Sequence, residues 1–561
     1  MTVSNLIVAG EAGQGLATIG EILTRTMVRH GLYVCVTQDY QSRIRGGHNT
    51  FSVRVSDEEV AAPAAEYDVL VALNQESVDL HKNHMTEKGV IIADAALQSP
   101  DSAISVPFNE LADTRMWNVA ALGILAVVLG LDTSLLQNTI DDHFKKPELA
   151  DKNREVLEKA LEWARRNAAG KTVALPDTSQ TERLMLNGNQ AIALGAMSAG
   201  VRFYSFYPMT PATSIALTLI KYAEKTGILV EQAEDEIAAL NMALGASFAG
   251  APAMTGTSGG GFALMVEGLS LAGMTETPVV IALAQRPGPA TGLPTRTEQA
   301  DLEFAIYAGH GEFPRLVFAP GSSEECFELT HKAFHMAEKY QSPVIILTDQ
   351  FLADSYRSVA PFDIQRKAPV KAGANGEETS DYKRYRFTEN GVSPRRVPGW
   401  SADLVVADSD EHFEDGHITE DHEVRTRMVD KRLKKMEGLK SETEAPLYEG
   451  DEGPDLLMVT WGSAIGAVRE AARKLSEEGK NVATLHFRQV WPLLPEQFTG
   501  YLQKAGRTVA VESNATGQFA RLIRRETGIE IDDKVLRYDG LPLTAEQVLQ
   551  EVRGREGGQN G

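Results

Sequence analysis

The amino-acid sequence predicts an α/β protein with three α/β domains, each built on a mainly parallel sheet. The prediction rests on short apolar runs that alternate with helical patterns in three stretches, residues 1–170, 187–364 and 451–552. Such alternation is typical of parallel strands that are joined and covered by helices. A chain of 561 residues is also long enough for about three or four domains. The pattern is lost between the blocks, which indicates a linker over residues 171–186 and a polar extension over residues 365–450.

Each block contains several apolar runs that predict strands. In the first block the expected strands are residues 5–9, 32–38, 51–56, 67–73 and 90–95, and helical patterns dominate from about 115 to 168. In the second block they are residues 201–207, 252–257, 278–284, 315–320 and 343–349. In the third block they are residues 455–463, 481–487 and 508–513, with a helix over residues 464–475. The glycine-rich tail, residues 553–561, is expected to be flexible.

The composition restricts the possible functions. Acidic residues outnumber basic ones by 77 to 55, which gives a formal charge of -22 and argues against nucleic acid as a partner. No run of 18 apolar residues and no signal peptide pattern is present, so we expect a cytoplasmic protein without a membrane segment. The only cysteines are Cys35 and Cys326, whereas an iron–sulfur cluster usually needs four thiolates. We therefore expect neither a disulfide framework nor a cluster held by this chain alone.

A glycine-rich loop with the sequence GEAGQG follows the first predicted strand. Its Gly10, Gly13 and Gly15 allow close approach of a ligand to the backbone, and a helix N-terminus favours phosphate. A phosphate-bearing ligand such as coenzyme A, a substrate-side role and a purely structural tight turn all remain possible. The spacing differs from the dinucleotide fingerprint, so a nicotinamide dinucleotide is a weaker alternative. Nearby, Arg43 and Arg45 carry the geometry that pairs with carboxylate or phosphate, although a solvated loop explains them equally well.

Two motifs at the start of the second block have a simple structural interpretation. The segment YPMTP, residues 207–211, precedes a helical pattern, and its Thr210 is suited to cap that helix. The acidic triplet at residues 234–236 heads another helix, where carboxylates are ordinary partners of the helix dipole. Taken alone, both motifs are explained by helix capping.

Two later segments of this block favour a binding or catalytic site. Gly256, Ser258 and Gly260 match the G-x-S-x-G nucleophile elbow between a strand and a helix, which leaves a serine hydrolase as an alternative. The glycine run at residues 259–261 is loose for such an elbow, and no histidine is identified as the base. Residues 285–295 leave an apolar strand at its carboxyl end, where open α/β sheets bind ligands.

The polar extension contains an acidic run at residues 407–423. It carries His412, His417 and His422, but their five-residue spacing does not fit a structural zinc site. We expect a solvated or interface loop and no metal site.

Together the motifs resemble the alpha subunit of 2-oxoacid:ferredoxin oxidoreductases with an N-terminally fused gamma domain, most like the 2-oxoglutarate (2-oxoglutarate synthase) type. The resemblance follows the chain in order and rests on a series of short segments. These are GEAGQG, RIRGGHN, YPMTP, AEDEIAALNMALGASFAG, TGTSGGGFALM, RPGPATGLPT, KRYRFTENGVSPR, GHITED and VESNATGQFARLIR.

The resemblance implies a division of labour between two chains. Residues 1–170 are expected to be the gamma domain, residues 187–364 the pyrimidine-side thiamine diphosphate domain, and residues 451–552 a transketolase C-terminal-like domain. The beta subunit of such enzymes holds the diphosphate, Mg²⁺ and a [4Fe-4S] cluster, and passes electrons to ferredoxin. This chain has no GDG motif with a downstream asparagine pair, as expected for the subunit without the metal. A heterodimer or a dimer of heterodimers is implied.

Specific residues take roles from the resemblance. Glu236 matches the glutamate that hydrogen-bonds the aminopyrimidine ring and relays a proton, and Thr210 matches the hydroxyl near the reacting carbonyl. Arg286 and Thr295 resemble the pair that orients the substrate carboxylates, and Arg45 is a candidate for the distal carboxylate of 2-oxoglutarate. Residues expected to surround the cofactors are Tyr207, Pro208, Gly259 and Gly260 for the coenzyme, and Gly10, Gly13 and Gly15 for coenzyme A.

The implied reaction is the oxidative decarboxylation of 2-oxoglutarate to succinyl-CoA and CO₂, with electrons passed through the beta subunit to ferredoxin, in either direction. The same chemistry on pyruvate, indolepyruvate or branched-chain 2-oxoacids is an alternative. A hydrolase that uses Ser258, or a nucleotide-binding module built on the glycine-rich loop, leaves most of the other motifs unexplained.

Overall fold

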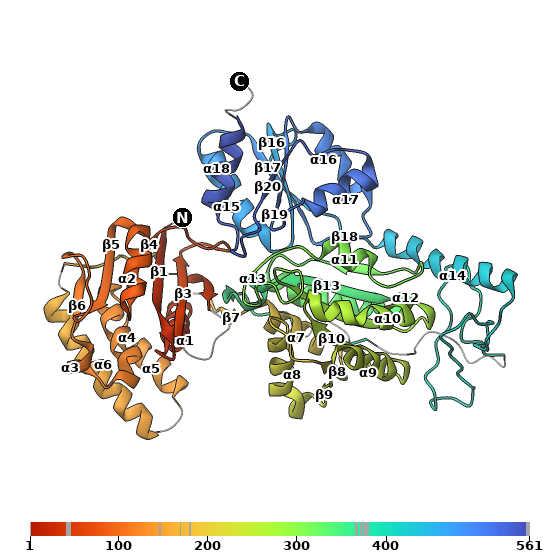
Figure 1. The fold of residues 1–561 in the computed structure, drawn as a ribbon, viewed down its shortest axis with the longest axis horizontal. Coiled ribbons are helices and arrows are strands. Elements are labelled where there is room, and N and C mark those ends of the chain that lie inside the picture. Colours follow the sequence, from red (N-terminus) through yellow and green to blue (C-terminus); the bar gives the residue numbers. More distant parts are fainter. Residues whose placement is uncertain are drawn as a thin grey trace. The chain divides into compact units, whose positions relative to one another are not determined.

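The computed structural model describes residues 2–40, 46–144, 147–168, 170–178, 181–364, 369–370, 373 and 381–556. The chain divides into two compact units (Figure 1). The N-terminal unit contains the residues up to Asn187 together with Asp354–Pro361 and Thr544–Glu546. The second unit contains Gly188–Ala353, Phe362–Leu543 and the residues from Gln547 onward.

The N-terminal unit is built on an eight-stranded sheet with the strand order β6-β5-β4-β1-β3-β2-β14-β7. The strands are β1 (Val3–Ala12), β2 (Tyr33–Asp39), β3 (Gly46–Ser56), β4 (Tyr67–Ala72), β5 (Met85–Asp94), β6 (Ile104–Val106), β7 (Leu184–Leu186) and β14 (Arg357–Val359). The helices are α1 (Leu16–Arg29), α2 (Gln75–His81), α3 (Phe108–Leu111), α4 (Trp117–Val128), α5 (Thr133–His143) and α6 (Pro147–Asn167).

This first sheet is mixed, which differs from the mainly parallel sheet expected for the block. Strands β1, β4, β5 and β6 run parallel, but β3 is antiparallel to both β1 and β2. The reason is the short connection between Asp39 and Gly46, which cannot contain the crossover that parallel neighbours need. The sheet is also extended by segments distant in sequence, because β7, within the predicted linker, pairs with β14.

The second unit contains a seven-stranded sheet with the order β18-β12-β13-β11-β10-β8-β9. Its strands are β8 (Phe203–Phe206), β9 (Leu229–Gln232), β10 (Ala253–Thr257), β11 (Val279–Gln285), β12 (Leu316–Phe318), β13 (Pro343–Asp349) and β18 (Gln489–Trp491). All neighbours are parallel except β12 and β18. Every residue of β11 and β13 is buried, as expected for central strands covered on both faces.

Helices enclose this sheet. They are α7 (Gly188–Ala199), α8 (Thr213–Thr226), α9 (Glu236–Phe248), α10 (Gly259–Met274), α11 (Leu302–Tyr307), α12 (Ser323–Tyr340) and α13 (Gln350–Asp354). The apolar side chains of α9 and α10 pack with β10 and β11 in one buried cluster, and α7, α8 and α12 contribute to another.

A five-stranded sheet follows in the same unit, with the order β15-β17-β16-β19-β20. Its strands are β15 (Leu447–Glu449), β16 (Leu456–Trp461), β17 (Val482–Phe487), β19 (Thr508–Glu512) and β20 (Asp533–Leu536). The helices are α15 (Ile465–Glu477), α16 (Thr499–Lys504), α17 (Gln518–Thr527) and α18 (Ala545–Glu556). Only β15 is antiparallel to its neighbour. The three-domain α/β fold expected from the sequence is thereby confirmed in its class.

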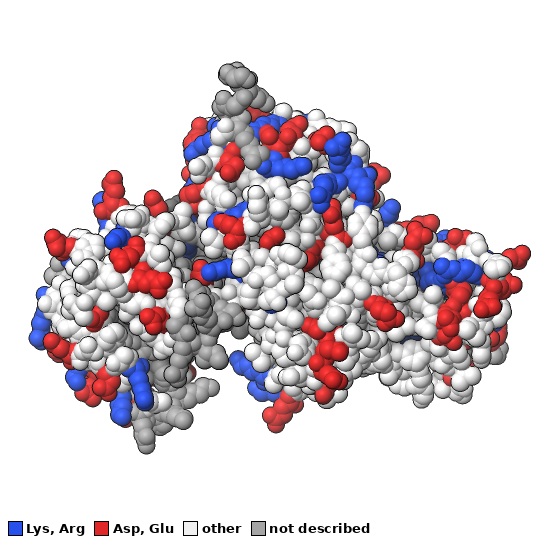
Figure 2. All heavy atoms as spheres, viewed as in Figure 1, with Lys and Arg blue, Asp and Glu red and all other residues white. Residues whose placement is uncertain are grey.

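The distribution of charge on the surface and the apolar character of the helices concern two expectations from the sequence, the one about nucleic acid and the one about a membrane segment. On the face drawn in Figure 2, basic side chains are interspersed with acidic ones. Within the described ranges, no helix has the length and apolar character required to cross a membrane.

The acidic run of the polar extension is more ordered than the solvated or interface loop expected for it. Glu411 forms ion pairs with Arg425 and Arg432, two residues of α14 (His422–Ser441), at 2.6 and 2.8 Å. His412 is completely buried and lies 3.9 Å, between ring centroids, from Tyr385. The run therefore forms part of the packed structure at these positions, a feature that its acidic composition concealed.

A buried charge cluster fastens this extension to the end of α10. The carboxylate of Glu276, which is fully buried, accepts a hydrogen bond from Lys431 Nζ at 2.6 Å and forms an ion pair with Lys435. The guanidinium of Arg384 donates to the backbone carbonyl of Glu276 at 2.8 Å. Burial opposes ionisation of Glu276, but the two lysines and Arg384 outweigh it and lower its pKa. Burial also lowers the pKa of Lys435 to about 7.

Glu276→Gln is expected to lower the free energy of unfolding by about 3–5 kcal/mol, because it leaves buried ammonium groups without a counter-ion. The measurement is denaturant unfolding monitored by circular dichroism. Glu423→Gln, at an exposed position of the same extension, is the matched control and should change stability by less than about 0.5 kcal/mol.

A second variant separates charge from packing in this cluster. Replacing Glu276, Lys431 and Lys435 together by methionine removes all three charges and should recover most of the lost stability. Equal stability of Glu276→Gln and the unchanged protein would show that the cluster does not fasten the extension.

Candidate functional site

Four adjacent strands of the seven-stranded sheet bring the predicted site residues to one edge. Strands β11, β10, β8 and β9 are neighbours and parallel, so their carboxyl ends lie together (Figure 1). Arg286 follows β11, and Ser258 follows β10. The YPMTP segment follows β8, and Glu236 comes shortly after β9. Open α/β sheets bind ligands at this edge, and motifs far apart in sequence meet here for that reason.

Glu236 is the buried acid of this edge. It is the first residue of α9 and is 3% exposed, and its Oε1 has no hydrogen-bond partner. The capping role belongs to Asp235, whose side chain accepts a hydrogen bond from the Ala238 N–H at 2.7 Å, while Glu234 is exposed. Capping therefore does not explain Glu236. An unsatisfied buried polar atom costs about 1–3 kcal/mol or more, which indicates a site that awaits a partner group.

The first turn of α10 encloses this acid on one side. A Cβ atom at Gly261 would lie 2.5 Å from Glu236 Oε1 and even closer to Thr257 Oγ1, so only glycine fits there. The hydroxyls of Thr257 and Ser258 are fully buried and also lack hydrogen-bond partners. Several unpaired polar atoms therefore gather around the glycine run at the start of α10.

The structure joins two more of the predicted residues. Arg286 Nη1 donates a hydrogen bond to the backbone carbonyl of Thr210 at 2.8 Å. Thr210 is not the cap of α8, since that helix begins at Thr213 after Ala212. Helix capping is thus excluded for Thr210, and its hydroxyl is available for another role.

The remaining predicted residues of the second unit differ in exposure. Tyr207 is 38% exposed and Pro208 is also exposed, whereas Thr295 is 9% exposed. Gly260 is exposed, and Gly259 is half-buried at the start of α10. Arg45, proposed from the sequence for the distal carboxylate, lies outside the described residues.

The serine hydrolase alternative lacks its essential pair. Ser258 is fully buried, and no hydrogen bond joins its Oγ to any described side chain. A serine nucleophile needs a base within hydrogen-bond reach, so the G-x-S-x-G match does not form a catalytic elbow here.

The glycine-rich loop of the N-terminal unit is stabilised by its own side chains. Gln14 Oε1 accepts a hydrogen bond from the Glu11 N–H at 2.7 Å, and a Cβ at Gly10 would collide with that oxygen. Gly15 has a φ of 77° as the cap of α1, which glycine adopts readily. A Cβ at Gly13 would meet nothing within 4 Å. Packing explains Gly10, positive φ values of 100° and 77° explain Gly13 and Gly15, and phosphate binding by the loop stays a prediction.

Two further acids near the edge escaped the sequence analysis. Burial raises the pKa of Asp301 to about 6, and burial together with Asp301 raises the pKa of Glu298 to about 7. Both follow the segment 285–295, which the sequence indicated as a ligand-binding segment, and neither was singled out there. Among the described residues, no group of three or more His, Cys, Asp or Glu side chains is arranged to hold a metal ion.

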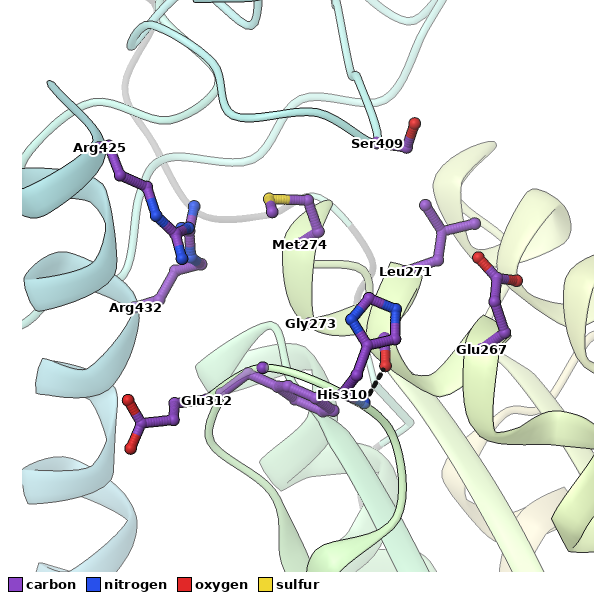
Figure 3. Close-up of a pocket in the computed structure, with 12 residues that line it drawn as sticks. Glu267, Leu271, Gly273, Met274, His310, Glu312, Ser409, Arg425 and Arg432 are labelled. Carbon is purple, nitrogen blue, oxygen red and sulfur yellow. Dashed lines mark hydrogen bonds between the residues drawn. The ribbon is translucent and has the colours of Figure 1, made fainter. Parts of the chain in front are cut away.

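A cavity of about 170 Å³ lies at the other end of α10 (Figure 3). Leu271 and Met274 of α10 face the arginines Arg425 and Arg432 of α14 across it, and His310 comes from a loop below. An α-helix rises 1.5 Å per residue, so this cavity is roughly 20 Å from the glycine run. It is therefore separate from the candidate site.

Comparisons with known families agree with this geometry. Residues 194–431 match the family described as "Pyruvate flavodoxin/ferredoxin oxidoreductase, thiamine diP-bdg". Residues 5–163 match the pyruvate ferredoxin/flavodoxin oxidoreductase family, and residues 448–548 match the transketolase C-terminal domain. The site described above lies within the first of these matches.

Relatives that match the whole chain identify the family more specifically than the matches to single segments do. The chain is 33% identical to a 2-oxoacid:ferredoxin oxidoreductase subunit alpha from Sulfolobus sp, over 97% of this chain and 96% of the relative. The chain belongs to the family of 2-oxoacid:ferredoxin oxidoreductase alpha subunits. The resemblance inferred from the motifs is thereby confirmed. This alpha subunit is an oxidoreductase component with a thiamine diphosphate-binding domain, and it is part of a multi-subunit enzyme.

Two other relatives carry 2-oxoglutarate in their names. The 2-oxoglutarate oxidoreductase subunit KorA of Mycobacterium tuberculosis is 28% identical over 97% of the alpha subunit and 90% of its own length. A solved structure has a TM-score of 0.93 and 32% identity, and covers 99% of both chains. It is the 2-oxoglutarate:ferredoxin oxidoreductase from Magnetococcus marinus with 2-oxoglutarate, coenzyme A and succinyl-CoA bound.

Gly261→Ala is expected to lower the oxidoreductase activity of the assembled enzyme at least about tenfold, because the added methyl group displaces the Glu236 carboxylate. The measurement is the initial rate of 2-oxoacid oxidation, at a temperature where circular dichroism shows the variant folded.

Gly245→Ala is the matched control for this change. Gly245 lies in α9, and a Cβ there would meet nothing within 4 Å. It should keep the unchanged rate, since alanine at an open helical position only adds helix propensity. An unchanged rate in Gly261→Ala would mean that the acid does not need its present position.

Proposed function

We propose that this alpha subunit serves the thiamine diphosphate-dependent oxidative decarboxylation of 2-oxoglutarate to succinyl-CoA and CO₂, with electrons passed to ferredoxin. The observation that carries the proposal is the buried, unpaired Oε1 of Glu236 at the carboxyl edge of a parallel sheet. A ring nitrogen of the coenzyme is a suitable partner for this oxygen. The residues present therefore fit the group that the family binds.

Glu236 exchanges a proton with the aminopyrimidine ring in this proposal. Thiamine diphosphate, when bound, supplies the carbon nucleophile and accepts the electron pair released in decarboxylation. Glu236 holds the ring through Oε1 and moves the proton, which is general acid–base work by a positioned carboxylate. The tight contact at Gly261 fixes the carboxylate, and burial excludes water from it.

Thr210, Arg286 and Thr295 are proposed to orient the substrate. The hydrogen bond from Arg286 Nη1 to the Thr210 carbonyl fixes these two residues relative to each other. A guanidinium pairs well with a carboxylate, so Arg286 suits the carboxylate end of a 2-oxoacid. Arg45 remains the proposed contact for the distal carboxylate, and the loop with Gly10, Gly13 and Gly15 the proposed contact for coenzyme A.

2-Oxoglutarate is favoured over other 2-oxoacids by two of the relatives that share the whole length of the chain, the Mycobacterium tuberculosis subunit and the Magnetococcus marinus enzyme. The Magnetococcus marinus enzyme, with a TM-score of 0.93, has 2-oxoglutarate bound. Pyruvate, indolepyruvate and branched-chain 2-oxoacids are the alternatives within the same chemistry. A substrate series with the assembled enzyme distinguishes them.

A beta subunit is proposed to supply the diphosphate site, Mg²⁺ and a [4Fe-4S] cluster, in a heterodimer or a dimer of heterodimers in the cytoplasm. Large apolar side chains are exposed on α8, on the edge strand β9 and on the two helices that begin at the site. They are Leu217 (60%), Ile220 (49%), Leu229 (58%), Ile237 (47%) and Leu264 (49%). Large exposed apolar side chains are typical of a surface that a partner covers.

Reconstitution tests the proposed function. The purified chain alone should not oxidise 2-oxoglutarate, and addition of a partner with a diphosphate motif and four cysteines should produce coenzyme A-dependent reduction of ferredoxin.

Ile237→Asp should weaken the association of the two subunits at least about tenfold, because it places a charge on the apolar surface. Ultracentrifugation measures the association.

Leu80→Asp is the matched control, since Leu80 is an exposed apolar residue of α2 in the N-terminal unit. It should associate like the unchanged chain. Oxidation of 2-oxoglutarate by the chain alone, or normal association of Ile237→Asp, would contradict the proposed partner and its surface.

A further inference from the structure

Asp301 is a half-buried acid beside the candidate site that the mechanism above does not use. It stands immediately before α11, yet its side chain makes no capping hydrogen bond to that helix. Its Oδ2 is buried and has no hydrogen-bond partner. Its backbone N–H donates to Oε1 of Gln285, the last residue of β11, at 2.9 Å. The main chain of Asp301 is therefore held while Oδ2 of its carboxyl group is left unpaired.

The carboxyl group of Asp301 lies against the first residue of α10. A Cβ atom at Gly259 would be 2.9 Å from Asp301 Oδ1 and closer still to Oδ2. Two residues further along the same turn, Gly261 is in the corresponding position against Glu236. The first turn of α10 thus has an acid against each of these two glycines, the buried Glu236 and the half-buried Asp301.

The N-terminal turn of α10 is suited to an anion. The first N–H groups of an α-helix lack partners within the helix, and α10 has 16 residues. The fully buried hydroxyls of Ser258 and Thr257 at this turn have no hydrogen-bond partners either. These unpaired donors point to a ligand with anionic oxygens, and the 2-oxoacid and coenzyme A both carry such oxygens.

Few positively charged side chains surround Asp301. Glu298 precedes it in the same loop, Glu236 lies on α9, and β11 contributes the neutral Gln285. Helix α17 contributes the neutral Gln518, which donates to the Ala300 carbonyl, and Arg521, which is paired with Glu303 at 2.7 Å. Burial alone accounts for the raised pKa of Asp301.

We propose that Asp301 is a ligand-positioning residue, which holds a proton and donates a hydrogen bond to an anionic oxygen of a substrate bound at the first turn of α10. The inference rests on the proposed function, because the ligand belongs to that reaction. An ionised carboxylate at this place would repel the ligand, whereas a protonated one binds it. Binding of the ligand and of one proton are therefore coupled.

The coupling has a definite sign. A ligand that requires protonated Asp301 raises the pKa of that group on binding, so its affinity falls as pH rises through the pKa of the free protein, about 6. The KM for the ligand should increase about tenfold per pH unit above that value.

The test is the pH dependence of KM for 2-oxoglutarate and, separately, for coenzyme A, measured between pH 6 and 9 with the assembled enzyme. One of the two KM values should rise with pH in the unchanged enzyme and stay flat in Asp301→Asn, whose amide keeps a donor at every pH. The substrate whose KM responds is the one that Asp301 contacts. Asp301→Glu should restore the pH dependence.

Glu303→Gln is the matched control, because this exposed acid two residues away is paired with Arg521 and should leave both profiles unchanged. If both KM values depend on pH identically in Asp301→Asn and the unchanged enzyme, the inference is overturned. An enzyme that oxidises neither 2-oxoglutarate nor the other 2-oxoacids contradicts the proposed function instead, so the two failures are distinguishable.

Discussion

The unpaired oxygen of Glu236 is the constraint on which the site depends. A buried carboxylate without a hydrogen bond is costly, and the fold keeps one at the edge where four parallel strands end. Two neighbouring residues keep this oxygen unpaired and in place. Asp235 caps α9, so Glu236 is not needed for that role. Gly261 has no side chain, and a Cβ there would displace the Glu236 carboxylate. A bound ring that offers a nitrogen satisfies the oxygen and makes the acid useful for proton transfer.

Helix α10 connects this site to the polar extension, because acidic side chains lie against both of its ends. At its first turn Gly259 and Gly261 lie against Asp301 and Glu236. Just beyond its last turn, Glu276 is held by lysines of α14. The extension, which has the composition of a solvated segment, therefore packs at the end of the helix whose first turn carries the glycine run.

The sequence predicted the strands of the second unit well, because β11 and β13 are short apolar runs with clear boundaries. It also identified Glu236, but only through the family resemblance, since its pattern equally suits a cap. It missed the antiparallel hairpin of β2 and β3, whose apolar runs look like those of parallel strands. It also missed Glu276 and Asp301, because each depends on residues brought close only by folding.

Proton transfer at the coenzyme is the direct test of this account. The carbon-bound proton of the thiazolium ring exchanges with deuterium at a rate that depends on the acid beside the aminopyrimidine, and NMR after rapid quenching measures this rate in the assembled enzyme. Glu236→Ala should slow the exchange at least about 100-fold, while Glu234→Ala, at the exposed neighbouring acid, should exchange at the unchanged rate. Equal exchange rates in Glu236→Ala and the unchanged enzyme would contradict the role of Glu236.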